Sequence, residues 1–88
     1  MFVEFVARVL DIRLDSRDGS GALWQVLLDT TKFTQGGPLG TLVAVAKSGA
    51  TLEVAVERVV EDEDGVWHFV RKPLIIGTEV RGRVSSEA

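Results

Sequence analysis

The sequence contains no cysteine and no tyrosine, and it has a single histidine, His68. The absence of cysteine excludes disulfide bridges and thiolate metal sites. Catalysis of the Ser-His-Asp type would have to use His68, which lies between Trp67 and Phe69. A histidine in such an apolar strand is more often packed and hydrogen-bonded than catalytic. We therefore predict that the chain is not an enzyme and that it binds no cofactor.

Long apolar runs are also missing. No stretch approaches the about 20 apolar residues that a membrane-spanning helix needs. The apolar N-terminal stretch is interrupted by Glu4 and Arg8 and has no basic region before it, so it does not read as a signal peptide. These features predict a cytoplasmic protein without a membrane partner.

Two further kinds of site lack their motifs. Gly36–Gly40 is rich in glycine but is followed by no Lys-Ser or Lys-Thr pair, so it is no phosphate-binding loop. The acidic run Glu61–Asp64 has consecutive carboxylates, and alternate side chains of such a run point apart instead of converging on a cation. We expect a solvated hairpin tip there, and no metal site.

With 88 residues the chain is predicted to form one domain, residues 1–88. Its 45% apolar content suits a folded protein. The net charge of −3 disfavours binding to duplex DNA by neutralisation of many phosphates. It leaves room for a local basic face, because the basic residues Arg71, Lys72, Arg81 and Arg83 all follow the acidic run.

The stretch Phe2–Asp15 alternates apolar and polar residues, but the phase of the alternation changes after Val9. Because side chains alternate between the two faces of a strand, a slip of one residue would turn the apolar side outward. A β-bulge near Val9 and Leu10 keeps it buried and bends the strand. We therefore predict a long, bent first strand that serves two sheets.

Turn signals recur about every ten residues through the rest of the chain, and Asp64-Gly65 is a strong hairpin signal. Between these signals we predict five more strands. Gly82, between two inward valines, suits a barrel corner or a close backbone approach. The pattern predicts an all-β fold, a small, six-stranded, mostly antiparallel barrel, OB-like or SH3-like. The predicted strands after the first are Ala22–Phe33, Thr41–Lys47, Thr51–Glu61, Val66–Lys72 and Thr78–Ser85.

Thr51–Glu61 has an alternative interpretation. Its β-branched residues favour a strand, while some of its apolar residues also fit a short helix at 50–61. The first predicted hairpin, with Arg8–Arg13 and Ser20–Asp29, resembles the first hairpin of OB-fold nucleic-acid binders. That resemblance implies a helix after the third strand, and a strand at Thr51–Glu61 departs from it.

One group of residues points to binding. Trp67, Phe69 and Arg71 alternate along one predicted strand face, and Arg81 and Arg83 alternate along another. Aromatic and arginine side chains on a β-surface stack bases and follow a phosphate backbone. Two other interpretations are open: the tryptophan and phenylalanine form the core while the valine–histidine face points outward, or both faces are covered in an oligomer.

The sequence therefore predicts a non-catalytic binding module. The first hypothesis is single-stranded nucleic-acid binding through Trp67, Phe69, Arg71, Arg81 and Arg83. The alternative is a protein-interaction or oligomeric assembly module, such as a small phage or accessory protein, in which case the partner is another protein or a second copy of the chain.

Overall fold

The computed structural model describes residues 2–19 and 21–85, which form an all-β domain. The strands make one antiparallel sheet in the order β4-β3-β7-β1-β2-β6-β5, and the sheet is not closed. The described residues include no helix that is long and apolar enough to cross a bilayer. The strands are β1 (Phe2–Asp18), β2 (Gly21–Leu28), β3 (Gly40–Val45), β4 (Thr51–Val56), β5 (Arg58–Asp62), β6 (Gly65–Val70) and β7 (Glu79–Ser85).

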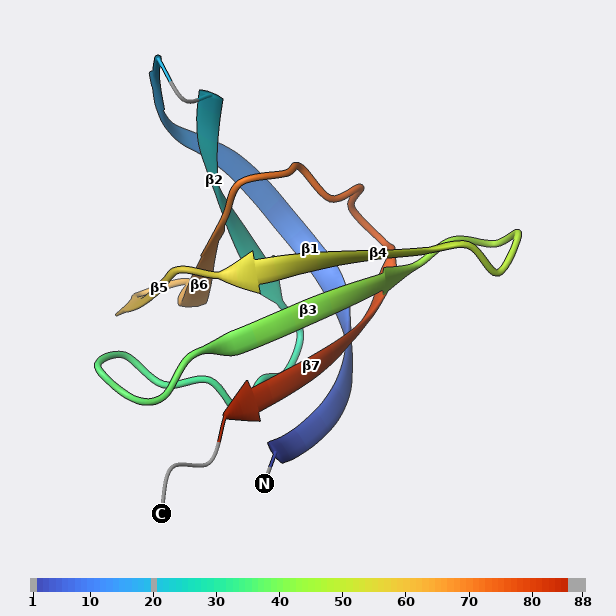
Figure 1. Cartoon of the computed structure of the whole chain (residues 1–88). Helices are drawn as coiled ribbons and strands as arrows, with labels where there is room; N and C mark the ends of the chain where they lie inside the picture. Colours follow the sequence, from blue (N-terminus) through green and yellow to red (C-terminus); the bar gives the residue numbers. More distant parts are fainter. Residues whose placement is uncertain (1, 20, 86–88) are drawn as a thin grey trace.

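The bulge predicted in the first strand is confirmed. In the pairing of β1 with β2, Val9 faces Leu28 and Asp11 faces Leu27, so Leu10 is the extra residue. Before the bulge β1 pairs with β7, and after it β1 pairs with β2. Figure 1 shows β1 crossing from one part of the sheet to the other. We call β4, β3, β7 and the start of β1 half A, and we call the rest of β1 with β2, β6 and β5 half B.

The sheet has seven strands and not six, because the predicted strand Thr51–Glu61 is divided at Glu57. The helical alternative for this stretch is wrong. The N–H of Glu57 donates to the carbonyl of Phe69 (2.8 Å), and Phe69 is also the residue opposite Arg58. Two consecutive residues therefore face one, which is the arrangement of a bulge. β4 belongs to half A and β5 to half B.

The core lies between the inner faces of the two halves. Gly82 faces Phe5 across β7 and β1, and a Cβ added at Gly82 would clash with the Phe5 ring. The group that closely approaches Gly82 is therefore the side chain of Phe5, and not a backbone segment as predicted. β2 ends at Leu28, so Phe33, at the end of the predicted second strand, enters the core from a loop. The buried cluster comprises Ala7, Val9, Val26, Leu28, Phe33, Leu42, Ala44, Val54, Val56, Val59, Val70, Leu74, Val80 and Val84.

Candidate functional site

β6 is buried on both of its faces. Val70 belongs to the core cluster, and the His68 ring lies edge-on to Phe33 with 5.3 Å between the ring centroids. Because side chains alternate along a strand, Trp67 and Phe69 lie on the outer face of half B. They are nevertheless only 2% and 5% exposed. The burial of Trp67 and Phe69 that the core interpretation predicted is therefore confirmed, but its second part is wrong, because the valine–histidine face does not point outward. We call Trp67 and Phe69 the covered aromatic pair.

Arg13 covers the first member of the pair. Its guanidinium carbon lies 3.8 Å from the centroid of the Trp67 ring, and its Nη2 lies 3.4 Å from Asp62 Oδ2. The Trp67 indole N–H donates to Asp62 Oδ1 (3.1 Å). The pKa of Asp62 is lowered, chiefly by the Asp64 backbone N–H. Desolvation, the next largest effect, raises it, and Trp67 and Arg13 each lower it by smaller amounts. The Trp67 ring thus has a cation on its face and an acceptor on its N–H.

A hydrogen-bonded side-chain layer extends this cover across half B. Arg13 Nε and Nη2 donate to Gln25 Oε1 (3.0 and 2.8 Å), and Gln25 Nε2 donates to Asp15 Oδ1 (2.7 Å). The Arg58 guanidinium carbon lies 5.5 Å from the centroid of the Phe69 ring. Each ring of the covered aromatic pair therefore has an arginine of the same chain over one of its faces, as in cation–π pairs.

The three arginines predicted to bind lie outside this hydrogen-bonded layer, Arg71 after β6 and the other two on β7. Arg71 follows β6, and its Nε bonds Glu57 Oε2 (3.1 Å) where both side chains are exposed. Arg81 and Arg83 are on the outer face of β7 in half A. Arg83 pairs with Glu4 at 3.6 Å. Each of these contacts is an exposed pair of the kind that contributes little to stability.

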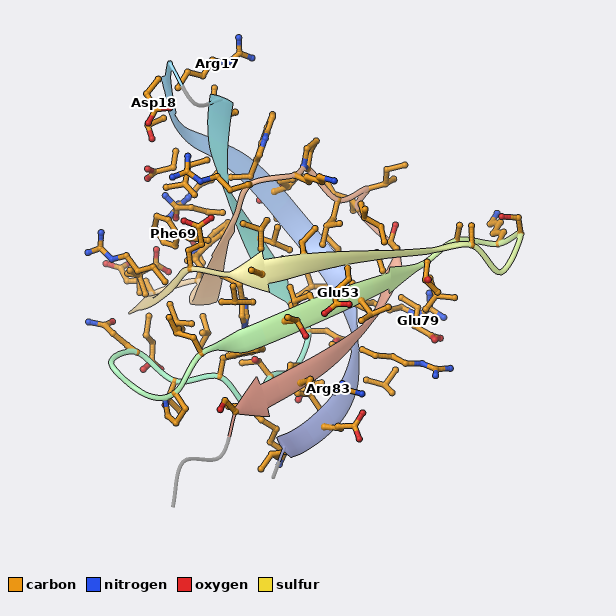
Figure 2. All side chains as sticks on the ribbon, viewed as in Figure 1. Arg17, Asp18, Glu53, Phe69, Glu79 and Arg83 are labelled. Atoms are coloured by element: carbon orange, nitrogen blue, oxygen red, sulfur yellow. The ribbon has the colours of Figure 1, made fainter. Side chains whose placement is uncertain are left out.

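The five predicted binding residues thus form separate groups and not one continuous face. Phe69 lies in half B and Arg83 in half A (Figure 2). Sequence reasoning missed Arg13 and Arg58, which cover the aromatic pair. Both occupy outward positions in their strands, and the signal that could have found them is the register that aligns them with β6.

His68 is packed as predicted. It is fully buried, and its Nδ1 lies 3.0 Å from the Val26 carbonyl oxygen. Because a carbonyl only accepts, Nδ1 carries the proton, and Nε2 accepts from the Thr31 hydroxyl (2.8 Å). Burial lowers the pKa of His68, with a smaller opposing effect of the bond to Val26. The ring is therefore neutral, with both nitrogens satisfied.

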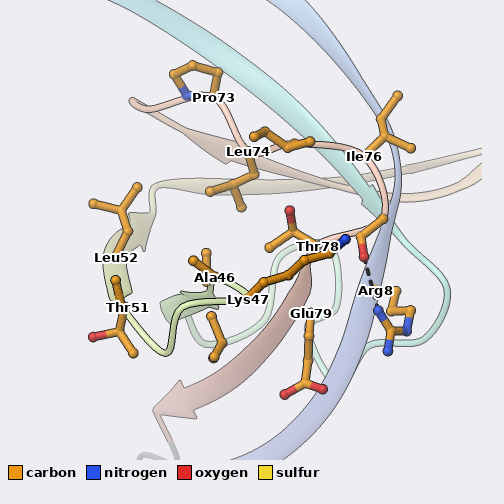
Figure 3. Close-up of a pocket in the computed structure, with 15 residues that line it drawn as sticks. Arg8, Ala46, Lys47, Thr51, Leu52, Pro73, Leu74, Ile76, Thr78 and Glu79 are labelled. Carbon is orange, nitrogen blue, oxygen red and sulfur yellow. Dashed lines mark hydrogen bonds between the residues drawn. The ribbon is translucent and has the colours of Figure 1, made fainter.

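A large groove lies away from the covered pair, between the β3–β4 hairpin and the connection from β6 to β7 (Figure 3). Its volume is about 970 Å³, at the upper end of the roughly 300–1,000 Å³ range of ligand sites. Its lining comes from residues 44–47, 50–52 and 73–79 together with Arg8. We call it the isoleucine groove, after Ile75 and Ile76.

The isoleucines project from a connection that is fixed to β1. Gly77 N–H donates to the Val9 carbonyl (2.7 Å), and Val9 N–H donates to the Thr78 carbonyl (3.0 Å). Arg8 Nη1 donates to the Gly77 carbonyl (3.0 Å). Leu74 is buried in the core and anchors the other end of the connection. The turn is therefore held in place while its isoleucines remain outside the core.

Ile75 is 80% exposed and Ile76 is 56% exposed. Leu52, across the groove, is 38% exposed. Single exposed apolar residues are ordinary, but a contiguous apolar patch marks an interaction site. Sequence reasoning did not identify Leu74–Gly77 as part of a binding site. The signal that could have identified it is the pair of adjacent isoleucines. A short turn that already buries Leu74 does not bury both of them as well.

Three charged residues stand at the groove. Glu79 lies opposite Arg8 in the sheet, and the Arg8 guanidinium is bonded to the connection. The Lys47 side chain extends from the hairpin into the groove (Figure 3). Among the described residues, Lys47 has no ion pair, so its ammonium group is available to a carboxylate.

The described residues contain no group of three or more histidine, cysteine, aspartate or glutamate side chains that could hold a metal ion. Comparison with protein-family models, with curated proteins and with solved structures finds no match to this chain. The function is therefore inferred from the chain's own residues.

Proposed function

We propose that this chain is a non-catalytic protein-interaction module that binds an extended apolar segment of a partner protein in the isoleucine groove. The observation that carries the proposal is the 80% exposure of Ile75 on a turn that hydrogen bonds hold against β1. Full burial of an isoleucine side chain stabilises by about 1.5–3 kcal/mol. A partner that covers Ile75, Ile76 and Leu52 gains this free energy without having to reorganise the connection.

The proposal ranks protein binding above nucleic-acid binding for two reasons. Base stacking on Trp67 would first have to displace Arg13, which lies on the ring at 3.8 Å. The arginines at 71, 81 and 83 are dispersed over two halves, and the chain carries a net charge of −3. Single-stranded nucleic-acid binding through the predicted residues is kept as the alternative hypothesis, and a cytoplasmic location stays a prediction.

We also propose that β4 and β5 act as one bent strand, so that the seven strands function as a six-stranded barrel of the OB-like or SH3-like kind. The single residue between β4 and β5 and the Glu57–Phe69 hydrogen bond support this view. β1 bends in the same way and takes part in both halves. The isoleucine groove would then be the place where the barrel wall is open.

The proposal can be tested by selection from a display library of random nonapeptides on the immobilised chain. We expect enriched peptides with several apolar residues that bind the wild-type chain. Binding is expected to be lost in the double variant I75D/I76D and kept in the control V6D, because Val6 is exposed as much as Ile76 (58% against 56%) but does not line the groove. A library that yields no peptide, or peptides that bind I75D/I76D normally, would contradict the proposal.

A further inference from the structure

We infer that the partner segment binds as an additional β-strand along β4, with an acidic side chain placed at Lys47. This inference rests on the proposed function and adds the mode of binding and the chemistry of the partner. Strand addition is a recurrent way to recognise an extended segment, because backbone hydrogen bonds supply affinity and pockets for alternate side chains supply specificity.

The β3–β4 hairpin determines which residues of β4 direct their backbone N–H and C=O groups toward β3 and which direct them outward. The N–H of Ala46 donates to the carbonyl of Ala50 (2.8 Å), so Ala50 directs its backbone groups toward β3. In an antiparallel pair this direction alternates from residue to residue. Thr51 and Glu53 therefore direct their N–H and C=O groups away from β3. The bond from Glu57 N–H to β6 agrees with this phase, since Glu57 is the third residue along the same series after Thr51.

The two edges of the sheet differ in how they are protected. At the β5 edge, Glu61 N–H donates to Gln35 Oε1 (2.8 Å), so a side chain of the loop after β2 occupies that edge. At the β4 edge, no hydrogen bond within residues 2–19 and 21–85 reaches the outward backbone groups of Thr51 and Glu53. An unpaired edge of this kind is a template for another strand.

The open edge lies beside the isoleucine groove. Thr51 and Leu52 belong to β4 and also line the groove, opposite Pro73 and Ile76 (Figure 3). A strand added to β4 would direct every second side chain into the apolar groove and the others outward. The recognised segment is therefore expected to be extended, with apolar residues at alternate positions.

The groove favours a single segment over a second copy of the chain. β4 has six residues, and a shared edge of that length is short for the about 800 Å² per partner that a stable dimer buries. The groove volume of about 970 Å³ instead suits the side chains of one inserted segment. The charge at the hairpin end is set by Lys47, which lacks an ion pair among the described residues. An aspartate or glutamate of the segment complements it.

The test uses the most enriched nonapeptide from the selection above. When it binds, amide hydrogen exchange at Thr51 and Glu53 should slow at least about tenfold, while Leu52 and Val54, which already bond β3, should change little. N-methylation of the peptide residues that direct their N–H groups toward β4 should weaken binding about tenfold. N-methylation of the residues between them should weaken binding little. E53P should weaken binding where E53A does not, because proline removes an outward N–H that β3 does not use. K47A should weaken binding of a peptide with an acidic residue more than that of its amide counterpart.

The outcomes separate the two proposals. One outcome would overturn strand addition but leave the groove as the binding site. In it, the peptide does not bind I75D/I76D, yet exchange at Thr51 and Glu53 is unchanged on binding, or N-methylation at either set of alternate peptide residues has little effect. A library without any groove-dependent peptide overturns both. If E53P does not fold, the exchange and N-methylation measurements on the wild-type chain still decide. A dimer that covers β4 at micromolar concentration overturns the choice of occupant.

Discussion

The guanidinium carbon of Arg13 lies 3.8 Å from the centroid of the Trp67 ring. Arg13 is in β1 and Trp67 is in β6, and β2 separates the two strands in the sheet. The side chain of Arg13 therefore reaches over β2, where it also bonds Gln25. This relationship converts an outward tryptophan into a buried one and leaves the isoleucine groove as the larger accessible apolar feature.

Replacement of Arg13 by alanine should uncover Trp67. We expect R13A to lower the free energy of unfolding by about 1 kcal/mol, because the cation–π contact is lost, and to shift the Trp67 emission to longer wavelength. W24F provides a background in which Trp67 is the remaining tryptophan. R17A, also in β1, is the control and should change neither quantity. Unaltered emission in R13A would show that other groups cover the ring.

Gly82 should tolerate no side chain while Phe5 is present. A Cβ at Gly82 would overlap the Phe5 ring, so G82A is expected to cost about 1–3 kcal/mol in urea unfolding. G19A is the matched control, since a Cβ there meets nothing within 4 Å. In the F5L background the effect of G82A should become smaller. Equal effects in both backgrounds would mean that the ring does not restrict Gly82.

Stability should fall with acid through His68. Its pKa in the folded chain is lowered from the ordinary 6.5 by burial, so the unfolded chain takes up the proton first as the pH falls. The contribution of neutral His68 to the free energy of unfolding is complete above about pH 6.5. It is lost as the pH drops through 6.5 toward the lower pKa of His68 in the folded chain. Urea unfolding of the wild-type chain and H68Q at several pH values checks this. If the free energy of unfolding falls equally in the wild-type chain and in H68Q between pH 7 and 5.5, this prediction is contradicted.

Oligo-dT should not bind the covered aromatic pair. At micromolar protein and low salt we expect no saturable quenching of tryptophan emission, because Arg13 and Arg58 already occupy the ring faces. Quenching that saturates, weakens with salt and is lost in R81A/R83A would instead support the nucleic-acid prediction. R71A in the same experiment tests the remaining predicted arginine.

Local patterns in the sequence were enough to predict several features of the fold. The phase change after Val9 predicted the bulge at Leu10, and the β-branched residues of Thr51–Glu61 favoured strand over helix. Each of these depends on residues that are neighbours along one strand, where the period of two is directly visible.

The division at Glu57 and the binding surface could not be predicted in the same way. The division depends on a bond between Glu57 and Phe69, which are distant in the sequence. The cover on Trp67 depends on the registers of three strands, and a shift of one residue in any of them would turn Arg13 to the other face. The exposure of Ile75 depends on bonds between the connection and β1.

The claim that the isoleucine groove is the binding site is tested most directly by nitrogen–proton correlation spectra of the labelled chain during titration with the selected nonapeptide. We predict that the largest shifts fall on the amides of residues 46–52 and 74–79, and that I75D/I76D abolishes them. Shifts centred on β6 and Arg13, or on the arginines of β7, would contradict the claim.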